Sequence, residues 1–219
     1  MNYSSSFNQL GSMETIKNLS SKDFKEQQEG INSVKKMLEH LNPVDEPLLI
    51  SLIPMILELS SEKRLLIELE LLSGELVKKI NSYSFELIFN EISKVFNTVK
   101  FQAKIQGLRM IGLYAKQYPL IVSSNLPIII ESLVQLSSDI KKEVKNAVQE
   151  CWVAICETIT NVDMKPIIPA LIDGYMNPST KTEFALEKMA SQALVNDVDI
   201  PTLALLIPML VRAMRENIL

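Results

Sequence analysis

The sequence has few of the residues from which catalytic, metal-binding and disulfide-linked sites are built. Its 219 residues include one histidine, two cysteines and six glycines. One histidine, His40, is too few for a histidine-based zinc site, and a Ser/His/Asp triad is not available. Cys151 and Cys156 lie on different faces of one predicted helix, so we expect two unpaired, buried thiols. Since no glycine-rich phosphate-binding motif occurs either, we expect no enzyme activity, cofactor, metal or small-molecule substrate in this chain.

Long apolar runs and a strong charge of one sign are also absent. The longest apolar runs, residues 47–59 and 200–211, contain prolines and are too short to span a bilayer. A formal net charge of -4 argues against general binding to nucleic acid. Residues 1–13 are polar and lack the apolar core of a signal peptide. We therefore predict a disordered polar arm or tag over 1–13, a folded domain over 14–219, and a cytoplasmic monomer that does not enter membranes.

A repeated pattern organises most of the chain. An apolar residue, a proline and apolar residues two and three positions later recur around Pro54, Pro127, Pro169 and Pro208. The first interval is about twice the others, and Asn90 stands where the missing proline is expected. The resulting period of roughly 36 to 42 residues is that of a helix pair in a HEAT array. Because an interior proline bends a helix, we expect these prolines to give successive repeats a shared bend.

Each proline-containing helix is followed by a second helix with its own apolar stripe. We predict second helices over residues 61–80, 101–117, 141–158 and 181–194, with apolar residues three and four positions apart. In the third we expect Trp152 to pack in the core, and Asp139 to cap the helix N-terminus. One pair buries too little apolar surface to fold alone, so the pairs must stack. The fold class predicted is all-α, a right-handed α-solenoid of about five HEAT repeats made of antiparallel helix pairs. The stripe of the last second helix is expected to contain Phe184, Leu186, Met189 and Leu194.

Basic residues recur where the second helices begin, at the same period as the repeat. Stacking would align them in a row along one edge, which we call the basic ridge. Two interpretations stay open: a ladder of acid–base pairs between neighbouring repeats, or a row that contacts phosphates of ribosomal RNA. The alternating Glu68 and Glu70, by contrast, are expected to form a solvated face. The basic ridge consists of Lys63, Arg64, Lys100, Lys104, Lys141, Lys142, Lys145 and Lys181.

From about residue 100 onward the chain resembles the HEAT region of fungal-type translation elongation factor three. The resemblance rests on residues 101–105, 139–145, 168–172 and 205–210, and on Glu157, Thr158, Asn161 and Asp163. It implies a HEAT array that precedes a helical bundle and two ATP-binding cassettes in a factor that binds ribosomes and clears deacylated tRNA from the exit site. No cassette is present here, so ATP hydrolysis is not carried over. Asn90 and residues 181–186 depart from the family pattern.

A second resemblance involves residues 198–205, which are similar to part of the HEAT-repeat translational activator of the amino-acid-starvation kinase. Both resemblances imply a ribosome-binding interaction surface in protein synthesis, with ribosomal proteins and ribosomal RNA as expected partners. An importin-like transport or scaffold adaptor is a further alternative, but such adaptors need rows of Asn and Trp. A spacer without a direct partner is another. At the C-terminal end, a first helix over 201–217 has no second helix to cover it, so we expect a truncated array with partly bare Leu203, Leu206, Leu210 and Met214.

Overall fold

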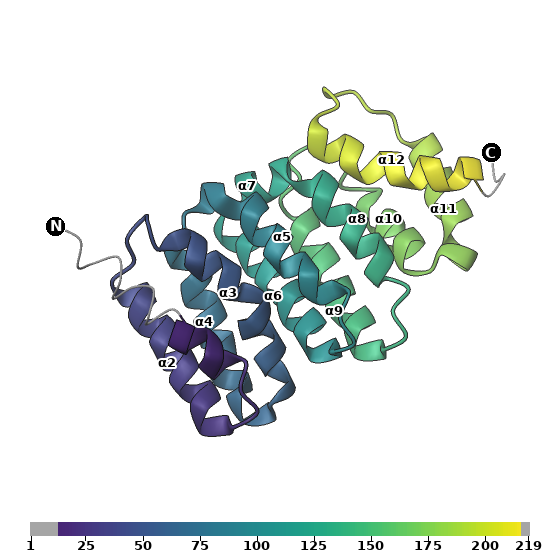
Figure 1. Cartoon of the computed structure of the whole chain (residues 1–219). Helices are drawn as coiled ribbons and strands as arrows, with labels where there is room; N and C mark the ends of the chain where they lie inside the picture. Colours follow the sequence, from purple (N-terminus) through teal and green to yellow (C-terminus); the bar gives the residue numbers. More distant parts are fainter. Residues whose placement is uncertain (1–12, 216–219) are drawn as a thin grey trace. The chain divides into compact units, whose positions relative to one another are not determined.

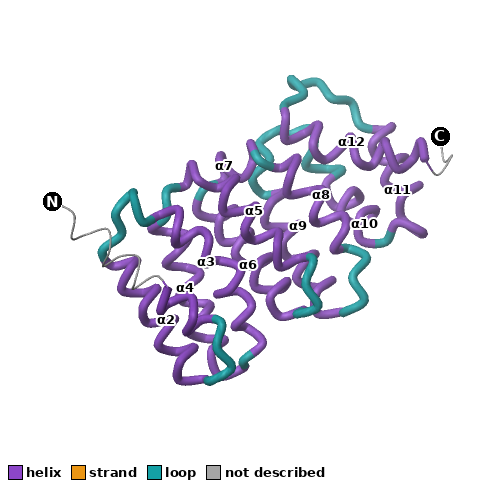
Figure 2. Tube along the Cα trace, in the orientation of Figure 1, coloured by secondary structure: helices purple, strands orange, loops and turns teal. Residues whose placement is uncertain are grey.

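The fold is helical throughout the part of the chain that the structure describes. The structure is a computed structural model that describes residues 13–215. Residues 13–215 contain helices, turns and loops but no β-strand, as the tube in Figure 2 shows. The chain divides into two compact units, with the boundary between Met110 and Ile111, inside one helix. The all-α prediction is confirmed, and each unit is described separately below.

The first unit contains two layers of helices. After a helical segment over 13–19 come α2 (Phe24–Glu39), α3 (Glu46–Glu58), α4 (Leu66–Lys79), α5 (Phe85–Phe96) and the first part of α6 (Phe101–Gln117). Short 3-10 turns, η1 (Leu59–Ser61), η2 (Lys63–Leu65) and η3 (Ser82–Ser84), connect them. α3 packs against α5, and α2 packs against α4 (Figure 1). Equivalent helices of successive pairs therefore lie side by side, which is the packing expected of stacked helix pairs.

The second unit contains the remaining helices. They are α7 (Pro119–Ser124), α8 (Leu126–Leu136), α9 (Lys142–Cys156), α10 (Ile168–Met176), α11 (Pro178–Ser191) and α12 (Ile200–Arg215). α9 packs against α8 and α10, and α10 forms a tight hairpin with α11. α12 packs mainly against α8 rather than against α10. α10 is a short helix of 9 residues that nevertheless packs against α9, α11 and α12.

The recurring prolines do not occupy one helical position. Pro127 and Pro169 lie in the first turn of α8 and α10, where a missing N–H costs nothing, because the first four N–H groups of a helix have no partner. Pro54 and Pro208 lie inside α3 and α12. Asn90, which takes the place of the proline, lies exposed in the middle of α5. The expectation of one shared bend is therefore wrong, because the helices begin at different distances before the proline.

The predicted second helices are present, and α9 shows the clearest agreement. α6 has the predicted bounds, and every apolar residue expected to face inward from α9 is buried. Trp152 is fully buried and stacks on Tyr175 of α10, so its assignment to the core is confirmed. Cys151 and Cys156 are free, buried thiols, as predicted. Burial raises the pKa of the Cys156 thiol to about 12 and also raises that of Cys151.

The stripe predicted for α11 is wrong. Phe184 is 43% exposed and Leu194 lies beyond the end of the helix, while Leu186 and Met189 are half-buried. The buried residues of α11 are Thr182 and Ala185. The reason is the close approach of α10, where a Cβ built on Gly174 would lie 2.9 Å from the Cβ of Ala185. Two helices approach this closely only where small residues face each other, so the small residues determine the buried face.

The expectations for the two ends of the chain are answered only in part. Met13 is helical, and residues 1–12 of the predicted polar arm lie outside the described residues. α12 covers most of the predicted last helix, up to Arg215, and residues 216–219 lie outside the description. Leu206 is buried, against expectation, because α12 packs on α8. Leu203, Leu210 and Met214 are exposed as expected. None of the described helices is long and apolar enough to cross a membrane.

Candidate functional site

The basic ridge residues lie where the sequence predicts, at or just before the second helices. In the first unit, Lys63 and Arg64 form part of η2, Lys100 precedes α6, and Lys104 lies in its first turn. In the second unit, Lys141 is the residue before α9, and Lys142 and Lys145 lie in its first turn. Lys181 lies in the first turn of α11. The two groups belong to different units, so each is described by its own contacts.

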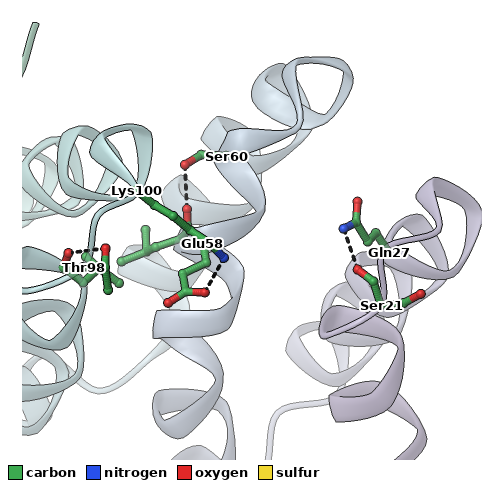
Figure 3. A network of polar contacts seen from close by, with 8 residues as sticks. Ser21, Gln27, Glu58, Ser60, Thr98 and Lys100 are labelled. Carbon is green, nitrogen blue, oxygen red and sulfur yellow. Dashed lines mark hydrogen bonds and ion pairs between the residues drawn. The ribbon is translucent and has the colours of Figure 1, made fainter.

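Two of the ridge residues in the first unit are paired with carboxylates. Lys100 Nζ lies 2.7 Å from Oε2 of Glu58, at the end of α3, and joins two successive repeats (Figure 3). Arg64 forms a two-point ion pair with Glu62, with Nε–Oε1 and Nη2–Oε2 distances of 2.8 and 2.9 Å. Its guanidinium also lies 4.0 Å from the centre of the Phe24 ring. The hydrogen bonds from Arg64 lower the pKa of Glu62 to about 2.

The remaining cations differ in their surroundings. Within residues 13–215, Lys63, Lys142 and Lys145 are exposed and form no ion pair. Lys181 Nζ lies 5.9 Å from the centre of the Phe184 ring, and Lys188 approaches the same ring at 5.5 Å. The Lys142 and Lys145 side chains are therefore the most available positive charges near the start of α9.

Asp139 has a slightly different role from the cap that the sequence suggests. Its Oδ1 accepts a hydrogen bond from the backbone N–H of Lys141 at 2.8 Å, and Lys141 is the residue that precedes α9. The side chain of Lys141 itself makes no capping hydrogen bond to α9. Through this bond to Lys141, the Asp139 carboxylate stabilises the turn that leads into α9. This position still brings a negative charge near the helix N-terminus, where it is favourable.

Glu70 of α4 is exposed, as expected of a solvated face, whereas Glu68 is half-buried, and each carboxylate forms an ion pair with another helix. Lys35 of α2 lies 2.5 Å from Glu68, and Arg109 of α6 lies 2.5 Å from Glu70. α4 is thus linked to α2 and to α6. Acid–base pairs between repeats are therefore present in the first unit, but apart from Lys100 they involve Lys35 and Arg109, which the sequence analysis did not single out.

A hollow of about 510 Å³ lies beside the Lys100–Glu58 pair. It is bounded by the segment 19–22, the end of α3 and the turn before α6, and its lining includes Lys22, Lys100, Glu58 and Glu62. Gln27 donates to the Ser21 carbonyl at 2.8 Å nearby (Figure 3). Because acidic and basic side chains are balanced here, the hollow does not favour a phosphate group.

Hydroxyl side chains recur at the ends of the first helices, a signal that the sequence analysis missed. Ser60 donates to the Leu57 carbonyl and Thr98 donates to the Val95 carbonyl, at 2.6 and 2.8 Å (Figure 3). Ser137 donates to the carbonyl of Leu133 at the end of α8. Each of these carbonyls also accepts a backbone N–H, so the hydroxyl adds a second hydrogen bond in the last helical turn. Their spacing follows the repeat, so periodicity could have revealed them.

Asn161 and Asp163, part of the resemblance noted above, have structural roles. Asp163 Oδ2 accepts hydrogen bonds from the backbone N–H groups of Val195 and Asn196 at 2.8 and 2.7 Å. Asn161 Nδ2 donates to the carbonyl of Asp197 at 3.3 Å. The two side chains therefore hold the loop between α11 and α12. The backbone hydrogen bonds lower the pKa of Asp163.

A groove of about 560 Å³ lies between the second half of α9 and α10. Its floor is aliphatic and includes Val153 and Ile172, while Glu157, Lys165 and Asp173 lie among its polar lining residues. Val153 is 49% exposed although it belongs to an otherwise well-packed helix. Among the described residues, no three His, Cys, Asp or Glu side chains are grouped so that they could hold a metal ion. The candidate sites are therefore the basic ridge and the groove between α9 and α10.

Comparison with known proteins gives the family. The sequence model of the family described as "EF3 N-terminal HEAT repeat" matches residues 4–151, about two thirds of the chain. The chain belongs to this family. The prediction of an elongation factor three HEAT region is confirmed, but the likeness extends well before residue 100, so confining it to the last part of the chain was wrong. As a member of the elongation factor 3 HEAT-repeat family, the chain is a HEAT-repeat region related to translation factors.

Individual relatives agree with the family assignment. Elongation factor 3 of Gonapodya prolifera is 30% identical over 175 residues, covering 78% of this chain and 16% of the relative. Elongation factor 3 of Phytophthora infestans is 36% identical over 118 residues, 54% of this chain and 11% of the relative. The stalled ribosome sensor GCN1 of Mus musculus is 26% identical over 141 residues, 64% of this chain and 5% of the relative. The chain thus spans less than a fifth of each of these relatives.

Proposed function

We propose that this chain binds the ribosome as an interaction surface in protein synthesis. Membership of the elongation factor 3 HEAT-repeat family supports this proposal, and so does similarity to a protein named as a sensor of stalled ribosomes. Such a surface needs no cofactor or substrate of its own, and it would act in the cytoplasm, as a monomer. The single observation that carries the proposal at the level of residues is the exposure of Lys142 and Lys145 near the start of α9.

We propose that the basic ridge contacts the ribosome and that its residues contribute unequally to the binding. Arg64 and Lys100 already neutralise carboxylates, so an RNA phosphate would have to compete with Glu62 and Glu58. Lys142 and Lys145 are exposed, with no ion pair among the described residues. Each cation that neutralises a phosphate releases about one counterion, which makes binding weaken as salt rises. We therefore assign the larger contribution to the α9 lysines, against ribosomal RNA or acidic ribosomal proteins.

Co-sedimentation of the purified chain with ribosomes tests the proposal. Wild-type chain should pellet with ribosomes at low salt and be released as salt rises. The triple variant Lys141→Glu, Lys142→Glu, Lys145→Glu should bind at least about tenfold more weakly and show a shallower salt dependence. A matched variant, Lys17→Glu, Lys36→Glu, Lys116→Glu, changes the same charge at exposed lysines outside the ridge and should bind like wild type. Equal sedimentation of all three proteins would rule out the basic ridge as the contact with the ribosome.

A HEAT segment of a ribosome-associated translational activator is the second candidate, because the GCN1 match covers 64% of the chain. Two ATP-binding cassette motifs in the same reading frame would favour the elongation factor, whereas a frame with further helical repeats and no cassette would favour the activator. The importin-like alternative has less support, because Trp152, the chain's single tryptophan, is fully buried and cannot anchor a peptide on the surface.

A further inference from the structure

One face of α9 combines separated charges with the apolar groove. The side chains at 142, 145, 149, 153 and 156 recur at intervals of three and four residues, so they share one side of the helix. The first four positions are exposed, and Cys156 is buried. We call this row the α9 stripe. It begins with Lys142 and Lys145, passes through Gln149 and Val153, and ends at Cys156, where α10 covers the helix.

The charged side chains on and beside the α9 stripe change from basic at its start to acidic at its end. The lysines lie at the N-terminal end of α9, whereas Glu157 follows its last residue and Asp173 faces the same groove from α10. Glu157 and Asp173 are exposed, and within residues 13–215 neither takes part in an ion pair. Lys165 is the single basic residue among the described residues that line the groove. The partial charges of the helix ends add to the same separation, positive at the start of α9 and negative at its end.

The floor of the groove is suited to an aliphatic or aromatic side chain of a partner. Val153, Ile159, Ile168 and Ile172 all contribute to the lining, and the volume of about 560 Å³ exceeds that of one large side chain. RNA is a poorer occupant, because bases stack on aromatic side chains and none of the described residues that line this groove is aromatic. Phosphates would also meet the carboxylates of Glu157 and Asp173. The chemistry of the face therefore favours a peptide segment.

We propose that the α9–α10 groove binds a protein segment with acidic residues on one side of an apolar anchor and a basic residue on the other. The apolar anchor fills the groove beside Val153, the basic residue pairs with Glu157 or Asp173, and the acidic residues contact Lys142 and Lys145. Lys142 lies about 16 Å from Val153 along the helix at 1.5 Å per residue. An extended peptide covers that distance in about five residues. The proposal shares Lys142 and Lys145 with the proposed function but does not depend on ribosome binding.

Synthetic peptides test the charge pattern directly. The probe is a fluorescein-labelled peptide of about a dozen residues with two acidic residues four and five positions before a leucine–phenylalanine pair and two lysines directly after it. Its binding to the full chain is followed by fluorescence anisotropy. Replacing the leucine–phenylalanine pair by two serines should weaken binding about tenfold or more, because the apolar burial is lost. Versions with acidic or basic residues on both sides should also bind more weakly than the probe.

Variants of the chain should change the preference as well as the affinity. Val153→Asp should weaken binding of the probe about tenfold, while Val162→Asp, at another exposed valine outside the groove, should leave it unchanged. Lys142→Glu with Lys145→Glu should make the peptide with basic residues on both sides the preferred one. Glu157→Lys with Asp173→Lys should favour the peptide with acidic residues on both sides. Circular dichroism would confirm that each variant keeps its helical content.

The outcomes separate this inference from the ribosome proposal. Absence of binding by all the peptides, binding that is insensitive to Val153→Asp, or tighter binding of single-stranded RNA at this face would overturn the inference. If the lysine variant also lost ribosome binding in any of these cases, the ribosome proposal would stand alone. Normal ribosome binding by the lysine variant, together with the predicted exchange of peptide preference, would support the groove and contradict the ridge.

Discussion

The rings of Trp152 and Tyr175 lie parallel, with their centres 4.9 Å apart and 3° between their planes. The Tyr175 hydroxyl donates a hydrogen bond to the Leu205 carbonyl, and the Arg212 guanidinium lies 5.6 Å from the centre of the Tyr175 ring. This cluster joins α9, α10 and α12. Since the chain has a single tryptophan, the cluster gives the second unit its own optical signal.

Tryptophan fluorescence should therefore report the unfolding of the second unit. We expect a blue-shifted emission maximum in the native protein, because Trp152 is fully buried, and a shift to longer wavelength on unfolding. Trp152→Ala should destabilise the second unit by about 3–5 kcal/mol. For the wild type, the measurement compares urea unfolding curves from fluorescence and from far-ultraviolet circular dichroism. The variant has no tryptophan, so its unfolding is followed by circular dichroism. If the two units unfold independently, the dichroism curve will contain a transition that fluorescence does not follow.

Two glycines should respond in opposite directions to substitution by alanine. A Cβ on Gly174 would lie 2.8 Å from Cε of Met209 and 2.9 Å from Cβ of Ala185, so Gly174→Ala should destabilise by about 1–3 kcal/mol. At Gly74, inside α4, the added Cβ would have no described atom within 4 Å apart from its chain neighbours and the backbone of its own helix. Gly74→Ala should stabilise by about 0.4–1 kcal/mol, because alanine loses less backbone entropy on folding. Thermal melts of both variants check this pair, and stabilisation by Gly174→Ala would contradict the close α10–α11 contact.

The Glu62–Arg64 pair should make a small, pH-dependent contribution to stability. The pKa of Glu62 is lowered from 4.5 to about 2 in the folded state by hydrogen bonds from Arg64. The ionised carboxylate therefore favours the folded state. This contribution is complete above pH 4.5 and is lost as the pH falls towards 2. Wild type should melt slightly above Glu62→Gln at neutral pH, and the gap should close at low pH. A gap that widens on acidification would contradict this assignment.

The two cysteines should be unreactive until the second unit opens. Both thiols are buried, and burial raises the pKa of Cys156 to about 12, so little thiolate is present near neutral pH. We expect slow labelling by a thiol reagent at pH 8 in the native protein and rapid labelling of both residues in denaturant. The variant Cys151→Ser with Cys156→Ser provides the unlabelled baseline. Fast labelling of the native chain would show that the end of α9 opens readily.

Much of the fold could be predicted because each helix carries a local pattern. The interval between prolines, and the spacing of apolar residues, predicted the helix pairs and the bounds of α6, and they predicted the buried side of α9. The basic residues at the helix starts were located by the same periodicity. Whether those residues bind a ribosome stays a prediction, because a lysine at a helix start occurs equally in an acid–base ladder.

The remaining features depend on residues far apart in the chain. The partners of Lys35 and Lys100, Glu68 and Glu58, lie 33 and 42 positions away, and no local pattern joins them. The buried face of α11 follows from Gly174 on another helix rather than from its own larger apolar residues.

The sequence by itself determined the helix pairs, their period and the family, because these depend on residues three and four positions apart and on short motifs. Tertiary structure alone decided the charge partners, the face that α11 buries and the groove between α9 and α10. The physical reason is that contacts between helices depend on side-chain volume and on the distance between helix axes. Both are properties of two segments together, whereas periodicity describes one segment at a time.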